Sequence, residues 1–364
     1  MDLSDYQATT DLSRAATIPA RWYLDAQFLD AERRKVFAST WQPVGQTRDV
    51  TEPGEYFACD IVGEPVVVVR GKDGVLRAFS NVCRHRASTV ATGRGKAPSL
   101  RCPYHGWTYG LDGRLIGQPE FEGVQDWDKS SVCLPQFRVE TWGPFVFVNQ
   151  DRNAPPLAEV LGTIPREVAQ IGCAPERLCF SERRDYVLNC NWKVYIDNYL
   201  EGYHLPAAHP GLFRELDYQK YRVDTFRYYS SQYAPIRPKK DPEQPRRYAF
   251  SGEDQSALYY WIFPNFMLNV YPDNMSSNII LPLGHDKTLT IFEWFSYAAE
   301  GGDAKPVAPE TIAFSDEIQQ EDITICENVQ RGLGSSTYTQ GRFSVKRENG
   351  VHHFHMLLNE FLSR

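Results

Sequence analysis

The residues best suited to chemistry lie in one stretch near the middle of the chain, Asn191–Pro210. Within it Glu201 precedes His204 by three residues, and His209 follows His204 by five. At about 3.6 residues per turn, Glu201 and His204 share one face of a helix, which Pro206 is expected to end at about His204. A carboxylate and an imidazole are costly to bury unless they have partners or bind a metal. We therefore predict that His204, at the helix end, and His209, in the following loop, bind a mononuclear iron.

A third ligand is expected from the last long helix, predicted at about 309–333. Asp322 occupies a position on the apolar stripe of that helix, where a carboxylate needs a reason to be buried. Two histidines and one carboxylate leave the other positions of a non-haem Fe(II) open for oxygen. Glu321 is the nearest alternative ligand, and an ion pair between Asp322 and an arginine is the structural alternative. The stripe consists of Ile318, Ile325, Val329 and Leu333.

A second set of metal-binding residues forms two short motifs, Cys83-Arg-His85 and Cys102-Pro-Tyr-His105, each beside a turn signal. Two thiolates on one iron and two imidazoles on the other are the ligands of a Rieske [2Fe–2S] cluster. The alternative is a structural zinc site, although zinc sites more often pair Cys with Cys and His with His. The four residues therefore predict an electron-storing cluster.

The elements that must position these residues change along the chain. A helical lead-in at about 23–39 precedes a β-rich region that ends near Asn149, with hairpins expected at 66–79 and at 109–116. Asn153-Ala-Pro-Pro indicates a boundary, followed by a helical stretch at about 157–171. In the helix expected after Asn191, the aromatic residues form a second face that should be buried. These residues are Trp192, Tyr195, Tyr199 and Tyr203. After His209 the chain turns β-rich, interrupted by a charged, proline-rich run at 237–247 that predicts an exposed loop or a lid.

Composition limits the class of protein. The chain has 364 residues, which suggests about two domains, and 42% of them are hydrophobic. A net charge of -7 argues against a nucleic-acid partner. No apolar run approaches the roughly 20 residues of a membrane span. The N-terminus lacks the features of a secretory signal, so a cytoplasmic location is expected. Eight cysteines are too few for a disulfide scaffold.

Together the motifs resemble the α (catalytic) subunit of the Rieske non-haem iron oxygenases. The resemblance rests on Cys-Arg-His-Arg, Cys-Pro-Tyr-His-Gly-Trp, Asn-Trp-Lys and Glu-Gly-Tyr-His-Leu-Pro-Ala-Ala-His, in that order. It implies an α+β chain with a Rieske β domain at 41–152 and a helix-grip catalytic domain at 153–364, to which the lead-in 1–40 belongs. It also implies a homotrimer in which the cluster of one subunit serves the iron of its neighbour.

The same resemblance gives a role to Glu201. Glu201 stands where the family usually has an aspartate that bridges the two metal centres across the subunit interface. It is expected to accept a hydrogen bond from His85 or His105 of the adjacent subunit while it contacts an iron ligand. Glutamate is one methylene longer, a departure that occurs in some members that act on trimethylammonium compounds. The structural alternative is a helix cap or a surface carboxylate. Asn198, in the same stretch, is the other candidate catalytic residue.

The chain has no convincing site for a pyridine nucleotide, because Gly93-Arg-Gly95 lacks the third glycine and runs toward Pro98. No plant-type ferredoxin spacing is present either. A separate NAD(P)H-dependent reductase, with or without a ferredoxin, is therefore expected to deliver electrons. O₂ and a small organic molecule are the expected substrates, and hydroxylation is the expected reaction.

The identity of the organic substrate is less constrained. Tyr259, Trp261 and Phe263 share one face of an aromatic strand. This face is expected to pack in the core, to bind a quaternary ammonium by cation–π contact, or to line a slot for a flat aromatic ring. Segments such as Ile262-Phe-Pro-Asn-Phe-Met and His352-His-Phe-His resemble the choline monooxygenase branch and favour choline or a betaine. The alternatives are an aromatic-ring dioxygenase and a Rieske electron carrier without oxygenase chemistry.

The remaining four histidines are expected to be structural. His352, His353 and His355 lie close together near the C-terminus with no matching carboxylate pair, and His285 sits beside Gly284 and an aspartate in an expected turn.

Overall fold

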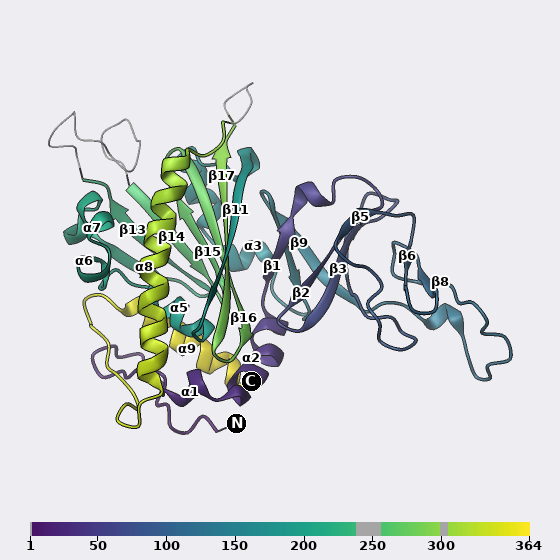
Figure 1. The fold of residues 1–364 in the computed structure, drawn as a ribbon, viewed down its shortest axis with the longest axis horizontal. Coiled ribbons are helices and arrows are strands. Elements are labelled where there is room, and N and C mark those ends of the chain that lie inside the picture. Colours follow the sequence, from purple (N-terminus) through teal and green to yellow (C-terminus); the bar gives the residue numbers. More distant parts are fainter. Residues whose placement is uncertain (1, 238–255, 299–304) are drawn as a thin grey trace. The chain divides into compact units, whose positions relative to one another are not determined.

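The computed structural model describes residues 2–237, 256–298 and 305–364, and the chain divides into two compact units. The smaller unit spans Phe37–Leu157, and the larger unit combines Met1–Val36 with Ala158–Arg364 (Figure 1). The predicted exposed loop or lid begins at Arg237 and otherwise lies outside the described residues. The smaller unit is built on antiparallel sheets and the larger unit combines an antiparallel sheet with helices, so the predicted α+β class is confirmed.

The smaller unit is built on a seven-stranded antiparallel sheet with the order β1-β10-β9-β4-β3-β2-β5, and on a three-stranded sheet β6-β7-β8. The two predicted hairpins are present as β3–β4 and β7–β8. The strands are β1 (Gln42–Gln46), β2 (Glu55–Ile61), β3 (Glu64–Arg70), β4 (Leu76–Ser80), β5 (Arg94–Lys96), β6 (Leu100–Arg101), β7 (Thr108–Tyr109), β8 (Leu115–Gly117), β9 (Gln136–Trp142) and β10 (Phe145–Asn149).

Strand β3 connects the two halves of this unit's core. Its run Val66–Val69 is fully buried, and successive side chains point to opposite faces of the sheet. Val67 and Val69 pack in the core cluster that contains Cys83 and Cys102, whereas the other two valines pack in the second cluster. An apolar run without alternation is typical of a strand that is covered on both faces. The cysteine-bearing loops are thus anchored on the sheet's own core.

The larger unit is a second seven-stranded antiparallel sheet, ordered β11-β17-β16-β15-β14-β13-β12, with helices packed against it. Helix α8 (Pro309–Leu333) crosses the sheet (Figure 1) and has the predicted bounds. Its proline occupies the first turn, where a missing N–H costs nothing. The strands are β11 (Leu178–Leu188), β12 (Arg222–Thr225), β13 (Tyr229–Pro235), β14 (Ser256–Ile262), β15 (Phe266–Val270), β16 (Asn274–Gly284) and β17 (Lys287–Tyr297).

Shorter helices complete the larger unit. The predicted lead-in helix is divided at Asp25, whose side chain accepts a hydrogen bond from the backbone N–H of Gln27 and caps the second half. The helices are α1 (Arg21–Leu24), α2 (Ala26–Lys35), α3 (Leu157–Leu161, beginning at the unit boundary), α4 (Ile164–Gln170), α5 (Trp192–Tyr199), α6 (Leu205–Ala208), α7 (Pro210–Glu215) and α9 (Asn349–Ser363).

The single helix predicted from Asn191 to about His204 is wrong. Helix α5 ends at Tyr199, and Pro206 opens the separate helix α6 instead of ending the first one. A proline is tolerated in the first turn of a helix because the N–H it lacks would have no partner there. The same break exposes Tyr203, which is 58% accessible rather than part of the buried aromatic face.

A buried ion pair attaches the N-terminal segment to α5. Lys193 Nζ lies 2.6 Å from Glu32 Oε1, and both side chains are completely buried. Trp192 Nε1 donates to the other carboxylate oxygen at 2.7 Å. Burial lowers the pKa of Lys193, while the negative charge of Glu32 opposes that change. The pair therefore ties α2 to the helix that leads into the histidine-bearing turns.

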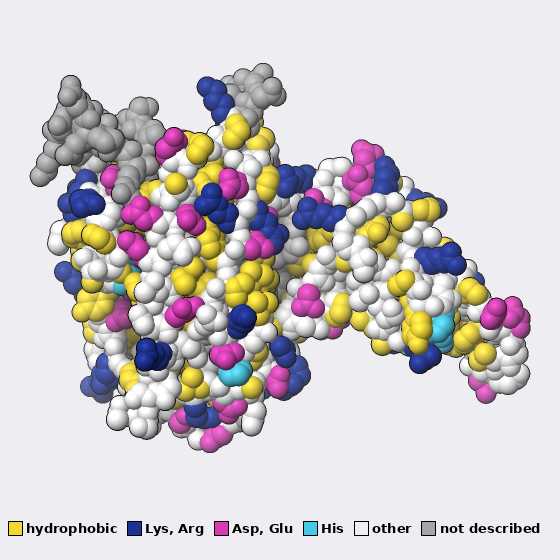
Figure 2. Space-filling view, viewed as in Figure 1, with side chains coloured by type: hydrophobic (Ala, Val, Ile, Leu, Met, Phe, Trp, Pro, Cys, Tyr) yellow, Lys and Arg dark blue, Asp and Glu magenta, His cyan; other side chains and the backbone are white. Residues whose placement is uncertain are grey.

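The surface of the described chain carries charges of both signs. On the face shown in Figure 2, acidic and basic side chains are interspersed and form no large patch of one sign. Among the described residues, no helix has the length and apolar character needed to cross a bilayer.

The buried pair gives a stability prediction. We expect Lys193→Met to lower the free energy of unfolding by about 3–5 kcal/mol, because it leaves the Glu32 carboxylate buried without its cation. Urea unfolding followed by circular dichroism measures the change. Asp30→Asn, which breaks the exposed pair with Arg33 on the same helix α2, is the control and should cost at most about 1 kcal/mol. Equal effects of the two substitutions would contradict the assignment of α2 as an anchor.

Candidate functional site

Three side chains of metal-binding type converge in the larger unit. His204, His209 and Asp322 each offer one ligand atom, and these atoms all lie within 4.8 Å of one another. His204 immediately precedes α6, His209 lies between α6 and α7, and Asp322 projects from the middle of α8. Two imidazole nitrogens and one carboxylate oxygen are the donor set of a non-haem Fe(II) site, so the residues present fit that metal.

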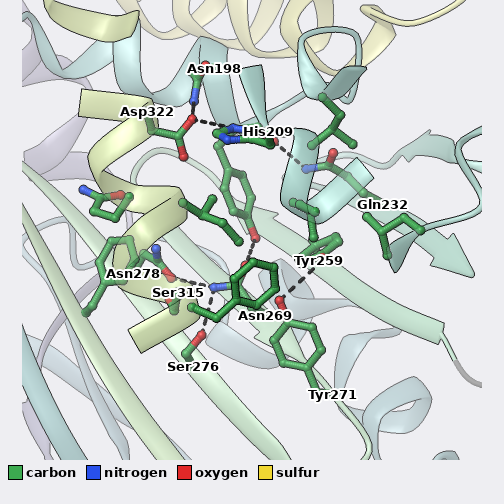
Figure 3. A pocket seen from close by; sticks show the side chains of 18 of the residues that line it. Asn198, His209, Gln232, Tyr259, Asn269, Tyr271, Ser276, Asn278, Ser315 and Asp322 are labelled. Carbon is green, nitrogen blue, oxygen red and sulfur yellow. Dashed lines mark hydrogen bonds and ion pairs between the residues drawn. The ribbon is translucent and has the colours of Figure 1, made fainter. Parts of the chain in front are cut away.

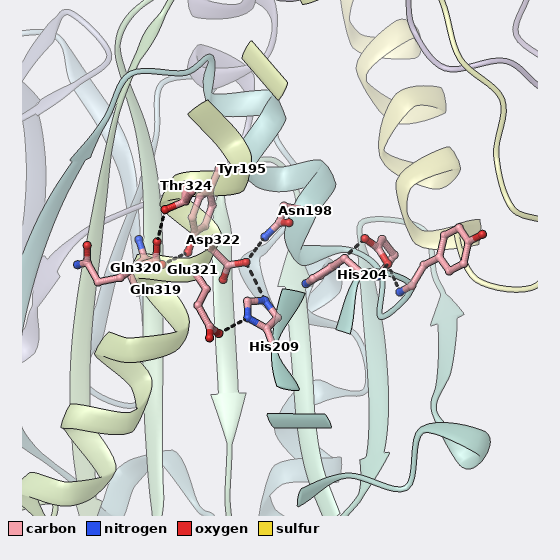
Figure 4. Close-up of polar contacts among 11 residues, drawn as sticks. Tyr195, Asn198, His204, His209, Gln319, Gln320, Glu321, Asp322 and Thr324 are labelled. Atoms are coloured by element: carbon pink, nitrogen blue, oxygen red, sulfur yellow. Dashed lines mark hydrogen bonds and ion pairs between the residues drawn. The ribbon is translucent and has the colours of Figure 1, made fainter. Parts of the chain in front are cut away.

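The Asp322 carboxylate is held by groups from two other segments (Figure 4). Asn198 Nδ2 donates to Asp322 Oδ1 at 2.6 Å, and His209 Nε2 lies 3.0 Å from the same oxygen. The Asn198 side chain therefore orients the carboxylate and does not itself enter the donor set. Groups of this kind around a metal site fix the geometry of its ligands.

Glu321, the alternative ligand, has a different position. Its Oε2 lies 2.6 Å from Nδ1 of His209, on the far side of the ring from Asp322. Burial disfavours the charged form of His209, but the hydrogen bonds to Asp322 and Glu321 outweigh burial and raise the pKa of this imidazole. The carboxylate of Glu321 thus fixes the orientation of the His209 ring.

Glu201 acts on the other histidine. Its Oε1 lies 2.6 Å from His204 Nδ1, and its Oε2 accepts from the backbone N–H groups of Tyr203 and His204. A carboxylate only accepts hydrogen bonds, so Nδ1 carries the proton and Nε2 keeps its lone pair for a metal. The predicted contact between Glu201 and His204 is therefore present. The same carboxylate also stabilises the local turn, as the structural alternative expected.

In the smaller unit the four predicted cluster residues come together at two loops. The imidazole rings of His85 and His105 lie 4.7 Å apart between centroids, and Cys83 and Cys102 are both buried. Nδ1 of His85 is buried and has no hydrogen-bond partner among the described residues. A buried nitrogen without a hydrogen-bond partner is unusual in a folded protein, and coordination to a metal ion accounts for it. The residues present therefore fit a cluster with mixed Cys and His ligands.

The loops also direct hydrogen-bond donors toward the sulfurs. Tyr109 Oη lies 3.3 Å from Cys83 Sγ and accepts from the backbone N–H of Arg84 at 2.8 Å, which leaves its own hydrogen free to point at the sulfur. Burial opposes ionisation of Cys102, but the N–H groups of Tyr104 and His105 help to lower the pKa of this thiol overall. Donors of this kind tune the potential of an iron–sulfur cluster.

A cavity of about 910 Å³, its opening to solvent included, begins at the His204–His209–Asp322 group and extends along the sheet (Figure 3). Side chains from α5, α6, α7, α8 and the five strands β13, β14, β15, β16 and β17 line it, together with residues of the loops between them. Eight aromatic rings contribute to its lining. They belong to Tyr195, Tyr199, Tyr221, Tyr259, Tyr271, Phe292, Trp294 and Phe314.

The aromatic face predicted for strand β14 divides between this cavity and the core. Tyr259 lines the cavity, whereas Trp261 and Phe263 pack on α9, against Phe354 at 5.5 Å and Phe361 at 4.8 Å between ring centroids. The prediction that all three rings could surround a substrate is therefore wrong. Sequence patterns did not predict most of the residues that line the cavity, because these residues lie on strands that are far apart in the sequence. The polar residues Asn274, Ser276 and Asn278 at every second position of one strand were the available signal.

The other histidines have protein partners or lie in a turn. His355 Nε2 is 2.9 Å from Asp197 Oδ1, and His352 Nε2 is 2.7 Å from the Thr9 carbonyl. Burial lowers the pKa of His353 to about 4. His285 lies in the turn between β16 and β17. Within the described residues, His204, His209 and Asp322 are the one group of three His, Cys, Asp or Glu side chains whose ligand atoms all lie within 4.8 Å of one another.

Comparison with known proteins assigns both units. The family model for the ring hydroxylating alpha subunit (catalytic domain) matches residues 175–364, and the model for the Rieske [2Fe-2S] domain matches residues 40–128. Chloroplastic choline monooxygenase from Arabidopsis thaliana is 36% identical over 99% of this chain and 86% of its own length. The carnitine monooxygenase oxygenase subunit of Escherichia coli (strain K12) is 34% identical over 94% of this chain and 93% of its own.

Solved structures agree with these relatives. A quaternary ammonium Rieske monooxygenase superposes with a TM-score of 0.83 at 30% identity, covering 96% of both chains. Naphthalene 1,2-dioxygenase from Rhodococcus sp. superposes at 0.74 but is 19% identical, so it shares the fold alone. The cofactors of the family are a [2Fe–2S] cluster and a non-haem iron. The chain belongs to the ring-hydroxylating α-subunit family of Rieske non-haem iron oxygenases.

Proposed function

We propose that this oxygenase hydroxylates a small quaternary ammonium compound of the choline or betaine class. The observation that carries the proposal is the cavity beside the iron-type site, which combines many aromatic rings with carboxylates. Among its described lining residues the charged side chains are Glu201 and Asp322, and the remaining ionisable groups are His204, His209 and tyrosines.

Such a lining favours a cation whose charged nitrogen carries no hydrogen-bond donor. The faces of Tyr, Trp and Phe rings attract a positive charge, with an energy of about 0.5–2 kcal/mol for each well-placed ring. A tetraalkylammonium has no N–H to pair with individual acceptors, so rings and diffuse negative charge are the chemistry that recognises it. Trp294, Tyr259 and Tyr271 offer rings from three different strands or loops around one volume.

The relatives support this choice. Choline monooxygenase and carnitine monooxygenase are similar along nearly the whole chain, and solved relatives contain L-carnitine or gamma-butyrobetaine. As an α subunit of this family, the chain uses O₂ with an organic substrate and takes electrons from a separate reductase. Four further points remain predictions: the reductase uses NAD(P)H, a ferredoxin takes part, the protein is a trimer, and it is cytoplasmic.

The residues receive the following roles in the proposal. Cys83 and Cys102 hold one iron of the cluster and His85 and His105 the other, while His204, His209 and Asp322 hold the mononuclear iron. The cluster supplies electrons and the mononuclear iron supplies oxygen activation.

Other side chains orient the ligands of the mononuclear iron and shield its surroundings from water. Asn198 keeps the Asp322 carboxylate oriented, and Glu201 holds the proton of His204 on Nδ1. Glu201 is also proposed to accept a hydrogen bond from a cluster histidine of a neighbouring subunit. The aromatic lining excludes water from the reacting carbon.

A substrate panel tests the function. We expect the purified protein with a reductase to consume O₂ and release hydroxylated product with choline, carnitine or a related betaine, and to be inactive with aromatic acids and hydrocarbons. An oxygen electrode measures O₂ consumption, and mass spectrometry identifies the hydroxylated product. Turnover of aromatic compounds alone would favour the ring-dioxygenase alternative. A reducible cluster without any substrate-dependent O₂ uptake would favour an electron carrier.

Metal content tests the three ligands. We expect Asp322→Ala to lose one iron atom per chain and all hydroxylation while the visible spectrum of the cluster is unchanged, because the two centres use separate residues. Glu310→Gln, an exposed position in the first turn of the same helix, should keep the full iron content. Elemental analysis measures the iron content of each variant, and the visible spectrum shows whether the cluster is intact. Full iron content in Asp322→Ala would remove this residue from the ligand set.

The Glu201 carboxylate gives a separate outcome. Glu201→Gln keeps an oxygen that accepts from His204 but loses the negative charge, so we expect both metal centres to remain. Coupled turnover should fall by about 10–100-fold, the usual cost of changing a group that orients a metal ligand. The ratio of product formed to O₂ consumed is the measurement, with Glu310→Gln as the reference. Full coupled turnover in Glu201→Gln would refute the bridging role.

A further inference from the structure

Gln319 is a buried amide on α8, three residues before Asp322. It is 1% accessible and lines the cavity, and residues three apart lie on the same side of a helix. Tyr195 Oη, on α5, donates to Gln319 Oε1 at 2.6 Å. Gln319 Nε2 in turn donates to Thr290 Oγ1, on β17, at 3.1 Å. One side chain therefore joins α8 both to a second helix and to the sheet.

Helices α5 and α8 are joined by two hydrogen bonds of matching spacing (Figure 4). The first runs from Tyr195 to Gln319. Three residues further along both helices, Asn198 Nδ2 donates to Asp322 Oδ1 at 2.6 Å. Three residues are almost one turn of a helix, so a shift or rotation of α8 that breaks the first bond also moves the carboxylate that accepts the second. The bond at Gln319 therefore helps to fix where Asp322 lies relative to α5.

The hydroxyls that Gln319 pairs are buried. Thr290 is 0% accessible and Tyr195 is 3% accessible, so solvent does not replace a lost partner. An amide carries both an acceptor and a donor, which suits a position between two hydroxyl groups. A hydrocarbon side chain of similar size would fill the space but would remove the acceptor for Tyr195 and the donor to Thr290. Buried polar groups that lose their partners destabilise the arrangement that buries them.

We propose that Gln319 is a positioning residue for hydroxylation, which keeps Asp322 directed at the two histidines. It acts through its bonds to Tyr195 and Thr290 and does not itself bind the metal. The role concerns an iron ligand and not the recognition of the ammonium group, so it applies to any substrate of this oxygenase. Without Gln319, Asp322 is free to move, and the mononuclear iron is held more weakly.

Release of the mononuclear iron to a ferrous-ion chelator, measured without substrate, tests this role. We expect Gln319→Leu to release this iron about 10-fold faster than the unmodified protein, because groups that orient metal ligands typically account for about 10–100-fold in metal affinity. Gln320→Leu is the matched control, since it makes the same change at the adjacent, exposed position of α8. It should release iron at the unmodified rate. The visible spectrum should show an intact cluster in both variants.

Two further measurements separate positioning from a general loss of stability. Electron paramagnetic resonance of the ferrous protein with nitric oxide should give a nitrosyl signal of altered shape in Gln319→Leu, because the ligand geometry changes. The ratio of product formed to O₂ consumed should also fall in this variant. The far-UV circular dichroism spectrum should match that of Gln320→Leu.

Tyr195→Phe assigns the effect to one bond. It removes the hydroxyl and keeps the ring that lines the cavity, so it should also release iron faster than the unmodified protein. Gln319→Leu and Tyr195→Phe break the same bond, so the rate increase in the double variant should be smaller than the product of the two separate increases. If Gln319→Leu does not fold, Tyr195→Phe carries the test.

Three results would overturn the proposal. They are iron release and a nitrosyl signal in Gln319→Leu equal to those of Gln320→Leu, a Tyr195→Phe protein that behaves like the unmodified one, and separate increases that multiply in full in the double variant. Failure of the proposed substrate class is distinguishable, because iron release and the nitrosyl signal are measured without substrate.

Discussion

The site depends on one shared oxygen atom. Asp322 Oδ1 receives the Asn198 amide at 2.6 Å and faces His209 Nε2 at 3.0 Å, so α5, the α6–α7 junction and α8 meet at a single carboxylate. A poorly exposed carboxylate is stable only with such partners or with a metal. The segments that supply the partners are fixed in turn by distant contacts. Of these, the buried pair of Glu32 and Lys193 secures α5 from its opposite side.

This convergence gives the cavity a graded polarity. Asp322 and His209 lie at one end of the cavity, and the neutral side chain of Ser276 and the ring of Tyr271 lie at the other (Figure 3). Strand alternation places Ser276 there, because Asn274, Ser276 and Asn278, at every second position in the first part of β16, line the cavity. Helix geometry produces the Asp322 end, since Glu321 and Asp322 are adjacent on α8 yet reach His209 from two sides.

Local patterns in the sequence predicted much of this arrangement. The bounds of α8, the hairpin β3–β4 and the four cluster residues follow from short spacings and turn residues, which act over a few positions. The end of α5 at Tyr199 was not predictable in this way, because Pro206 fits both the end of one helix and the start of the next. The cavity lining was missed for a further reason. Its rings come from strands whose pairing is decided by long-range packing, and Trp261 alternates with the lining yet belongs to the core.

The central claim is that one chain holds two unlike iron centres, a cluster and an oxygen-activating iron held by His204, His209 and Asp322. Electron paramagnetic resonance of the dithionite-reduced protein exposed to nitric oxide tests it most directly, because nitric oxide binds a ferrous ion that has an open position. The account predicts two signals in every preparation: one from the reduced cluster, and a high-spin nitrosyl signal that changes when choline is added. A cluster signal with no nitrosyl signal in iron-replete protein would contradict it.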